Sequence, residues 1–290
     1  MTEVAPGVVR DAVARALAED LGPLGDITAA LLDPSERGSA AFVPRKPGVL
    51  AGTACATETF AQVDTSVSVR WTAVDGDRVA AGQVIGTVEG PLASILTAER
   101  TALNFLCHLS GVATLTRRFV DAVESAPGSR ARIWDTRKTL PGLRALEKAA
   151  VRAGGGVNHR GSLSEMVLVK DNHLGRLGIT EAVRRARERW PGRTVEVECV
   201  RIGQVLEAVD SGADLVMLDN MSPDDVAQCV DLVGRRAVVE VSGGVTLETV
   251  ARYASTGADL ISTSAITQSA PAFDIGLDLF HRDDQLHASS

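Results

Sequence analysis

From about residue 131 onward, short apolar segments alternate with longer stretches of helical periodicity. Each segment is a nearly continuous run rich in Val, Ile and Leu, which is typical of parallel strands covered on both faces. The last four segments recur at nearly equal spacing, as in a β/α barrel. The six segments are "RIWDT", "MVLVK", "TVEVECV", "DLVMLDN", "AVVEVSG" and "ADLISTS".

The first 110 or so residues follow a different pattern. Residues 69–90 place turn residues between short alternating strands, which predicts a small antiparallel layer. Residues 96–124 have the periodicity of one long helix or two short ones, and the N-terminal stretch predicts an amphipathic helix rather than a signal peptide. We therefore expect an α/β protein with two domains, residues 1–112 and 113–290, and a tail from about residue 273 that packs back on the first domain.

Composition excludes several classes of function. The net charge of the 290 residues is −7 and the basic residues are dispersed, which argues against a nucleic-acid binder, as does an aromatic content of 3%. The sequence has no apolar run of the ~20 residues that a membrane-spanning helix needs, so we expect a cytoplasmic protein. Its four cysteines contain no CxxC pair, so neither a zinc site nor a disulfide scaffold is indicated.

Polar residues close the predicted strands. In β/α barrels the chemistry lies at the carboxyl ends of the strands, so these residues are candidates for one shared site. Five of the candidates on or near this edge are basic, and such a cluster suits a polyanion; the alternative is five separate surface cations. The strand-end residues are Arg137 with Lys138, Lys170, Glu198, Asp219, Ser242 and Ser264, and the basic set is Arg137, Lys138, His159, Arg160 and Lys170.

Two further features point to phosphate and metal chemistry. Glu196 and Glu198 alternate with valines and therefore face the same side of their strand, with Glu198 nearer its end. Together with Asp219, Glu198 suits Mg²⁺ whose other ligands are phosphate oxygens, or else the two carboxylates form ion pairs with the basic residues. In "EVSGGVTLETVARYA", the glycines precede a predicted helix with Thr246 as its N-cap, which favours phosphate binding by backbone N–H groups.

At this point the motifs resemble a known family. The stretches "EDLGPLGDIT", "ERTALNFL", "DTRKTLPGLR", "GGGVNHR", "LVKDNH", "VEVE", "MLDN" and "EVSGG", in this order, are similar to quinolinate phosphoribosyltransferase over nearly the whole chain. The resemblance implies an N-terminal α/β sandwich domain followed by an incomplete β/α barrel. It also implies a homodimer in NAD biosynthesis that converts quinolinate and phosphoribosyl pyrophosphate, with Mg²⁺, into nicotinate mononucleotide, pyrophosphate and CO₂.

The resemblance also implies roles for individual residues. The expected catalytic residues are Lys138, Lys170, Glu198 and Asp219, with Mg²⁺ near the last two. The expected pocket for the pyridine dicarboxylate contains Arg137, His159, Arg160 and Lys170, with Arg100 delivered from the neighbouring subunit and Lys138 contacting both substrates. Thr136 is a further substrate contact, and the phosphate site contains Ser242, Gly243, Gly244, Thr263 and Ser264.

Two residues depart from the family pattern. Ser264 stands where a glycine is usual and Gln268 where a histidine is usual, so the side chain of Ser264 either crowds the phosphate or donates a new hydrogen bond to it. The rival interpretations are a relative with the same scaffold that uses another acid, such as nicotinate, and a non-catalytic phosphate-binding barrel. The joint presence of Arg100, Arg137, Arg160 and Lys170 favours a dicarboxylate, and paired carboxylates at Glu198 and Asp219 argue against a pure binder.

Overall fold

The structure is a computed structural model that describes residues 4–172 and 177–280. By contacts between residues, the chain divides into two compact units. The first contains the described parts of Met1–Leu115, Leu140–Gly155 and Ala270–Ser290, and the second contains Thr116–Thr139 and the described parts of Gly156–Ser269. Over this part of the chain, no helix combines the length and the apolar character that crossing a membrane requires.

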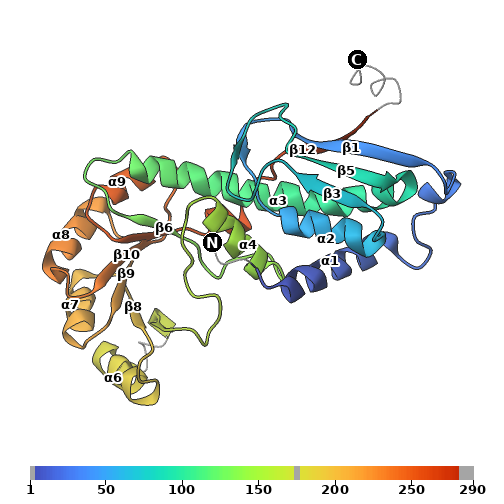
Figure 1. Cartoon of the computed structure of the whole chain (residues 1–290). Helices are drawn as coiled ribbons and strands as arrows, with labels where there is room; N and C mark the ends of the chain where they lie inside the picture. The colour runs from blue at the N-terminus through green and yellow to red at the C-terminus, as the bar shows by residue number, and fades with distance from the viewer. Residues whose placement is uncertain (1–3, 173–176, 281–290) are drawn as a thin grey trace. The chain divides into compact units, whose positions relative to one another are not determined.

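The first unit is built on a four-stranded antiparallel sheet (Figure 1). Its strand order is β12-β1-β5-β3, and the last strand of the chain pairs with the first, with Ala40 opposite Leu279. The strands are β1 (Arg37–Pro44), β3 (Ser68–Trp71), β5 (Gly86–Pro91) and β12 (Ile275–Leu279), and a separate two-stranded ribbon joins β2 (Gly48–Val49) to β4 (Arg78–Val79).

Helices cover one face of this sheet. They are α1 (Pro6–Leu21), α2 (Thr53–Val63) and the first part of α3 (Leu92–Glu124), with a 3₁₀ turn at Ala29–Leu31 and α4 (Arg144–Ala153) in the same unit. The sheet core centres on Phe42, whose ring stacks on Trp71 at a centroid distance of 4.8 Å and meets the edge of Phe60 at 6.1 Å. Residues 96–124 thus belong to one long helix, and strand β1 is an element that the sequence pattern did not predict.

The second unit contains one six-stranded parallel sheet. All six predicted apolar segments form its strands, in the order β6-β11-β10-β9-β8-β7. Successive strands from β7 to β11 lie side by side and β11 then pairs with β6, the first strand, so the sheet has the sequential order of an incomplete β/α barrel. The strands are β6 (Arg132–Trp134), β7 (Val167–Val169), β8 (Val195–Cys199), β9 (Leu215–Asp219), β10 (Val238–Ser242) and β11 (Leu260–Ser262).

The strands of the second unit alternate with helices (Figure 1). These are α6 (Ile179–Arg189), α7 (Ile202–Asp210), α8 (Pro223–Val233), α9 (Val250–Ala254) and α10 (Ala265–Gln268). Helix α8 shows how the local sequence sets a boundary: Ser222 accepts a hydrogen bond from the Asp225 N–H at 3.2 Å and Pro223 occupies the first turn. Gly234 ends the helix in the left-handed conformation, which a glycine adopts without steric cost. The predicted fold class, an N-terminal α/β domain with an incomplete β/α barrel, is confirmed.

Candidate functional site

The candidate residues on the parallel sheet lie at or just beyond the carboxyl ends of its strands. Arg137 and Lys138 follow β6, Lys170 follows β7, and Glu198 is the penultimate residue of β8. Asp219 and Ser242 end neighbouring strands and are direct partners in the β9–β10 register. Since all six strands are parallel, these ends lie along one edge of the sheet, as the sequence pattern predicted.

Lys170 and Glu198 form an ion pair at this edge, between the Lys170 Nζ and Glu198 Oε2. The Glu198 side chain is 13% exposed and the Lys170 side chain is 42% exposed. On the next strand, Asp219 accepts a hydrogen bond from the Asn220 side-chain amide at 2.8 Å. The sequence left two alternatives for these carboxylates, Mg²⁺ binding or ion pairing, and Glu198 forms an ion pair. A bound anion could compete with Glu198 for the ammonium group of Lys170.

Two guanidinium groups are close enough to affect each other. Burial lowers the pKa of Arg160, and the neighbouring charge of Arg137 lowers it further. The Arg160 Nη1 donates at 3.0 Å to the carbonyl of Met166, the residue that precedes β7. Like charges brought together in a partly desolvated place favour the binding of an anion between them.

His159 lies deeper than the other basic residues. The residue is 7% exposed, and its ring meets the edge of Trp134 at a centroid distance of 4.8 Å. Its Nε2 lies 3.1 Å from the Glu196 Oε2, and its Nδ1 accepts the Arg160 backbone N–H at 2.7 Å. The ring thus contacts the sheet interior on one side and the Arg160 backbone on the other.

Asp135, which follows strand β6, binds the "NHR" segment (residues 158–160) through hydrogen bonds. This residue is fully buried and accepts hydrogen bonds from the His159 backbone N–H at 2.8 Å and the Asn158 side-chain amide at 2.6 Å. A parallel bridge between Trp134 and Val157 brings the two stretches together. Asp135 was not among the predicted site residues, although its place at the end of a strand is the same cue that selected the others.

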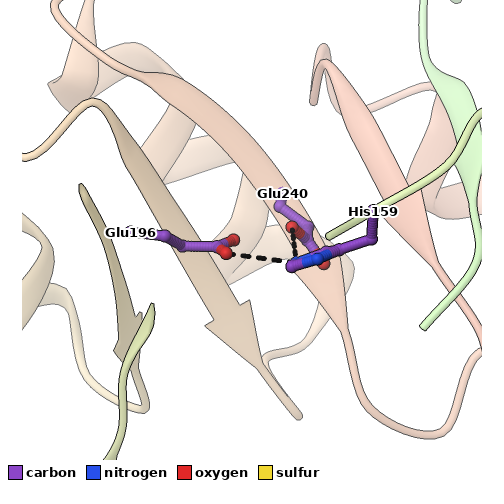
Figure 2. A group of neighbouring side chains, drawn as sticks. All are labelled: His159, Glu196 and Glu240. Atoms are coloured by element: carbon purple, nitrogen blue, oxygen red, sulfur yellow. Dashed lines mark hydrogen bonds and ion pairs between the residues drawn. The ribbon is translucent and has the colours of Figure 1, made fainter. Parts of the chain in front are cut away.

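Glu196 on β8 and Glu240 on β10 are buried next to His159. Both are fully buried, and Figure 2 shows their carboxyl groups converging on the His159 ring. The sequence pattern placed Glu196 on the same face as Glu198 but gave it no role, and it missed Glu240 entirely. The cue for Glu240 was present, since a single carboxylate alternating with valines in "VVEVS" faces the same side as the strand-end Ser242.

The late loop contains two glycines whose backbone conformation other residues rarely adopt. Gly243 and Gly244 have positive φ angles of 86° and 61°. A Cβ on Gly243 would lie 2.4 Å from the Asn220 Oδ1, so only glycine fits there. The prediction that Thr246 caps a following helix is wrong: α9 begins at Val250, and Thr246 instead belongs to a turn in which its N–H is bound by the Thr249 Oγ1 at 3.0 Å.

The remaining predicted residues lie as follows. Thr136 accepts a hydrogen bond from the Lys138 N–H at 3.0 Å, and the buried Thr263 donates to the Val245 carbonyl at 3.3 Å. Ser264 precedes α10, and its hydroxyl accepts a hydrogen bond from the Gln268 side chain at 3.4 Å, so the two departures from the family pattern contact each other. Arg100 is an exposed residue of α3 in the first unit. His173, the end of "LVKDNH", lies outside the described residues.

Comparisons with known proteins agree with this arrangement. The model of the N-terminal domain of quinolinate phosphoribosyl transferase matches residues 26–110, and that of the C-terminal domain matches residues 112–278. The nicotinate-nucleotide pyrophosphorylase (carboxylating) of Mycobacterium leprae is 42% identical over 93% of this chain and 96% of its own length. The probable enzyme of the same name from Bacillus subtilis is 40% identical over 90% of each chain.

A solved structure extends the likeness to three dimensions. The nicotinate-nucleotide pyrophosphorylase from Francisella tularensis superposes with a TM-score of 0.91 at 37% identity, over 96% of this chain and 98% of its own. Together the two domain models match residues 26–110 and 112–278, and the relatives and this structure each cover 90% or more of the chain. The chain therefore belongs to the quinolinate phosphoribosyl transferase family.

Proposed function

We propose that the protein transfers the phosphoribosyl group of phosphoribosyl pyrophosphate to quinolinate, releasing pyrophosphate and CO₂ and leaving nicotinate mononucleotide. The observation that carries the proposal is the pair of adjacent guanidinium groups of Arg137 and Arg160 at the edge that also bears Lys170. Three cations on one sheet edge suit a ligand with two carboxylates better than one with a single carboxylate.

In this assignment the dicarboxylate binds to Arg137, Arg160 and Lys170, with Lys138 and Thr136 beside it. Fixed cations orient the acid so that its ring nitrogen faces the anomeric carbon of the ribose, and no protein nucleophile is needed. The nitrogen–carbon bond forms as the bond to pyrophosphate breaks. Glu198 and Asp219 stabilise the positive charge that develops on the sugar, because both carboxylates lie at the ends of adjacent strands.

Decarboxylation follows from the first step. Once ribosylated, the ring nitrogen is positively charged and stabilises the electron pair that remains on the adjacent ring carbon when its carboxylate leaves as CO₂. A proton then replaces the carboxylate on the ring carbon. The protein contributes chiefly by holding the ring and excluding bulk water, so we assign no general base.

Ser242, Gly243, Gly244, Thr263 and Ser264 are assigned to the phosphate. Support comes from the backbone of the two glycines, whose φ angles are 86° and 61°. Backbone N–H groups of a loop with positive φ angles bind phosphate oxygens well.

Mg²⁺ fits the carboxylates of this edge. Glu198 and Asp219 belong to no ready-made group of three ligands among residues 4–172 and 177–280, whereas Mg²⁺ characteristically uses one or two carboxylates and takes its other ligands from substrate phosphates and water. When bound with phosphoribosyl pyrophosphate, the ion would neutralise charge on the departing pyrophosphate.

Turnover of the purified protein tests the proposed function. The protein is given phosphoribosyl pyrophosphate and Mg²⁺ with either quinolinate or nicotinate, and nucleotide and CO₂ are followed together. We expect nucleotide with equimolar CO₂ from quinolinate only. Nucleotide from nicotinate would assign the protein to the other acid, and binding of phosphoribosyl pyrophosphate without turnover of either acid would favour a non-catalytic barrel.

A pair of arginine variants tests the pocket. Arg137→Ala is expected to abolish turnover while the fold survives. Arg132→Ala is the matched control, since Arg132 is an exposed residue at the opposite end of the same strand. Unchanged kinetic constants in Arg137→Ala would contradict the assignment.

A homodimer with Arg100 crossing the interface is part of the proposal and rests on the family resemblance. Mixing Arg100→Ala with Lys170→Ala protein should restore part of the turnover, because each heterodimer would contain one site with both residues intact. Absence of rescue in mixtures that demonstrably exchange subunits would refute the shared site. The cytoplasmic location also stays a prediction.

A further inference from the structure

Thr267 lies beside the loop that carries Lys138, and the proposed reaction gives it no role. This threonine belongs to the short helix α10 of the second unit and is 1% exposed. Its hydroxyl donates a hydrogen bond to the Lys138 carbonyl at 2.8 Å, although the two residues are 129 positions apart in the chain. A buried hydroxyl that binds the backbone of a proposed substrate contact is a candidate for positioning that contact.

The parallel sheet brings the two segments together. Strand β11 pairs with β6, with Ser262 opposite Trp134, and the Thr263 N–H donates to the Trp134 carbonyl at 3.1 Å. The bond between Thr267 and Lys138 joins the same two segments four residues further along each of them. The hydroxyl of Thr267 therefore continues beyond the strands a connection that backbone groups make within the sheet.

The hydroxyl proton of Thr267 has two acceptors within reach. The Ser264 carbonyl lies 3.3 Å from the Thr267 Oγ1, but it already accepts the backbone N–H groups of Thr267 at 3.2 Å and of Gln268 at 3.1 Å. A carbonyl oxygen has two lone pairs, so both are used by these N–H groups. The Lys138 carbonyl is the closer acceptor, and it receives the proton.

Lys138 depends on its backbone for its position. The residue is exposed, so packing does little to fix the base of its side chain. Its N–H donates to the Thr136 Oγ1 at 3.0 Å, and its carbonyl accepts the Thr267 hydroxyl. These two bonds hold the two planar peptide groups on either side of the Lys138 Cα, and the direction of the side chain follows from those planes.

We infer that Thr267 is a positioning residue, whose hydroxyl holds the Lys138 backbone so that the ammonium group points at the bound substrate. The inference rests on the proposed function, which places Lys138 beside the dicarboxylate and assigns Ser264 to the phosphate. Thr267 links these two assignments, because its hydroxyl binds the carbonyl of Lys138 and its N–H binds the carbonyl of Ser264.

Two substitutions at Thr267 separate the hydroxyl from the shape of the side chain. Valine has the same branched shape without a proton to donate, and serine keeps the hydroxyl without the methyl group. We expect Thr267→Val to weaken quinolinate binding about fivefold by calorimetry, as for one lost hydrogen bond, and Thr267→Ser to stay within about twofold of the unaltered protein. Equal losses in the two variants, or no loss with valine, would overturn the proposal.

Thr59→Val is the matched control. Thr59 is fully buried in α2 of the first unit, and its hydroxyl donates to the Cys55 carbonyl, also at 2.8 Å. The substitution deletes the same kind of bond in the other unit, so the affinity for quinolinate should not change. A fivefold loss in this variant as well would attribute the effect to general destabilisation and would count against a special role for Thr267.

A double-mutant cycle tests whether Thr267 acts through Lys138. Lys138→Ala removes the ammonium group and keeps the backbone carbonyl, so in that background Thr267→Val has no cationic side chain to misplace. We expect the fivefold loss of quinolinate affinity to disappear there. Losses that multiply would show that Thr267 acts on some other group, and the positioning role would be refuted.

Hydrogen exchange tests the contact without any substrate. The backbone amides of residues 134–141 should exchange faster with deuterated water in Thr267→Val than in the unaltered protein, and serine should restore the slower exchange. Unchanged exchange in the valine variant would contradict the inference. This measurement is independent of substrate, so absence of quinolinate binding in the unaltered protein would refute the proposed function and leave the hydrogen bond tested on its own.

Discussion

Replacing Asp135 with alanine should destabilise the second unit more than any exposed substitution of the same kind. The carboxylate is fully buried, and its two oxygens accept hydrogen bonds from the His159 backbone N–H and from the Asn158 side chain. Alanine removes both acceptor oxygens, so the His159 N–H and the Asn158 amide lose these hydrogen bonds in a buried place. The "NHR" segment would then be connected to strand β6 by the remaining contacts, such as the Trp134–Val157 bridge.

The expected cost follows from these two bonds. A hydrogen bond to a charged group contributes about 1.5–3 kcal/mol, so Asp135→Ala should cost about 3–6 kcal/mol. Asp135→Asn keeps one acceptor oxygen and should cost about half as much. Since whole domains are stable by only about 5–15 kcal/mol, the alanine variant should be close to unfolding.

Urea unfolding followed by Trp134 fluorescence measures this cost. Trp134 is the neighbour of Asp135 on β6, and replacing Trp71 and Trp190 with phenylalanine leaves it as the only indole reporter. Asp210→Ala is the control, because that carboxylate is 67% exposed in a surface ion pair and should contribute less than about 1 kcal/mol. If Asp135→Ala lowers the free energy of unfolding by no more than Asp210→Ala, the argument from buried hydrogen bonds fails.

Three further predictions concern other parts of the chain. Ser264→Gly should raise the KM for phosphoribosyl pyrophosphate about threefold and leave that for quinolinate unchanged, because the serine hydroxyl still has its own proton to donate to phosphate; a lower KM would indicate crowding instead. Burial raises the pKa of Cys55 and of Cys199 to about 12, so neither thiol should react with a thiol reagent at pH 8 until the protein is unfolded, and labelling of the folded protein at either residue would contradict this. The hydrogen bond from Arg45 lowers the pKa of Asp278, so the pair stabilises the fold above the ordinary aspartate pKa of 3.8 and loses that effect as the pH falls through the lowered value. The stability difference between the wild type and Arg45→Ala should therefore shrink in acid, and a difference that grows there would reverse the sign.

Much of the parallel sheet could be predicted from local patterns. Continuous Val, Ile and Leu runs identify buried parallel strands because such strands are covered on both faces. All six segments predicted in this way form the sheet of the second unit. Polar residues such as Lys170 and Asp219 were selected by their place at strand ends, and the parallel direction of the strands brings them to one edge.

Long-range pairing was not visible in the pattern. Strand β1 pairs with β12 at the far end of the chain, and the alternation of a short strand does not specify which distant segment completes its ladder. The turn at Thr246 is a similar case, since a threonine before an apolar stretch suits a helix cap and a turn equally well.

By itself, the sequence determined the type of each apolar element on the parallel sheet and the cationic character of its edge, because both depend on neighbouring residues in the chain. Only the tertiary structure decided that His159 is buried and that its two ring nitrogens are occupied by Glu196 and the Arg160 backbone. It also decided that Glu240 joins them from another strand. The physical reason is that a buried ionisable group takes its protonation state from the partners around it, and those partners come from segments far apart in the sequence.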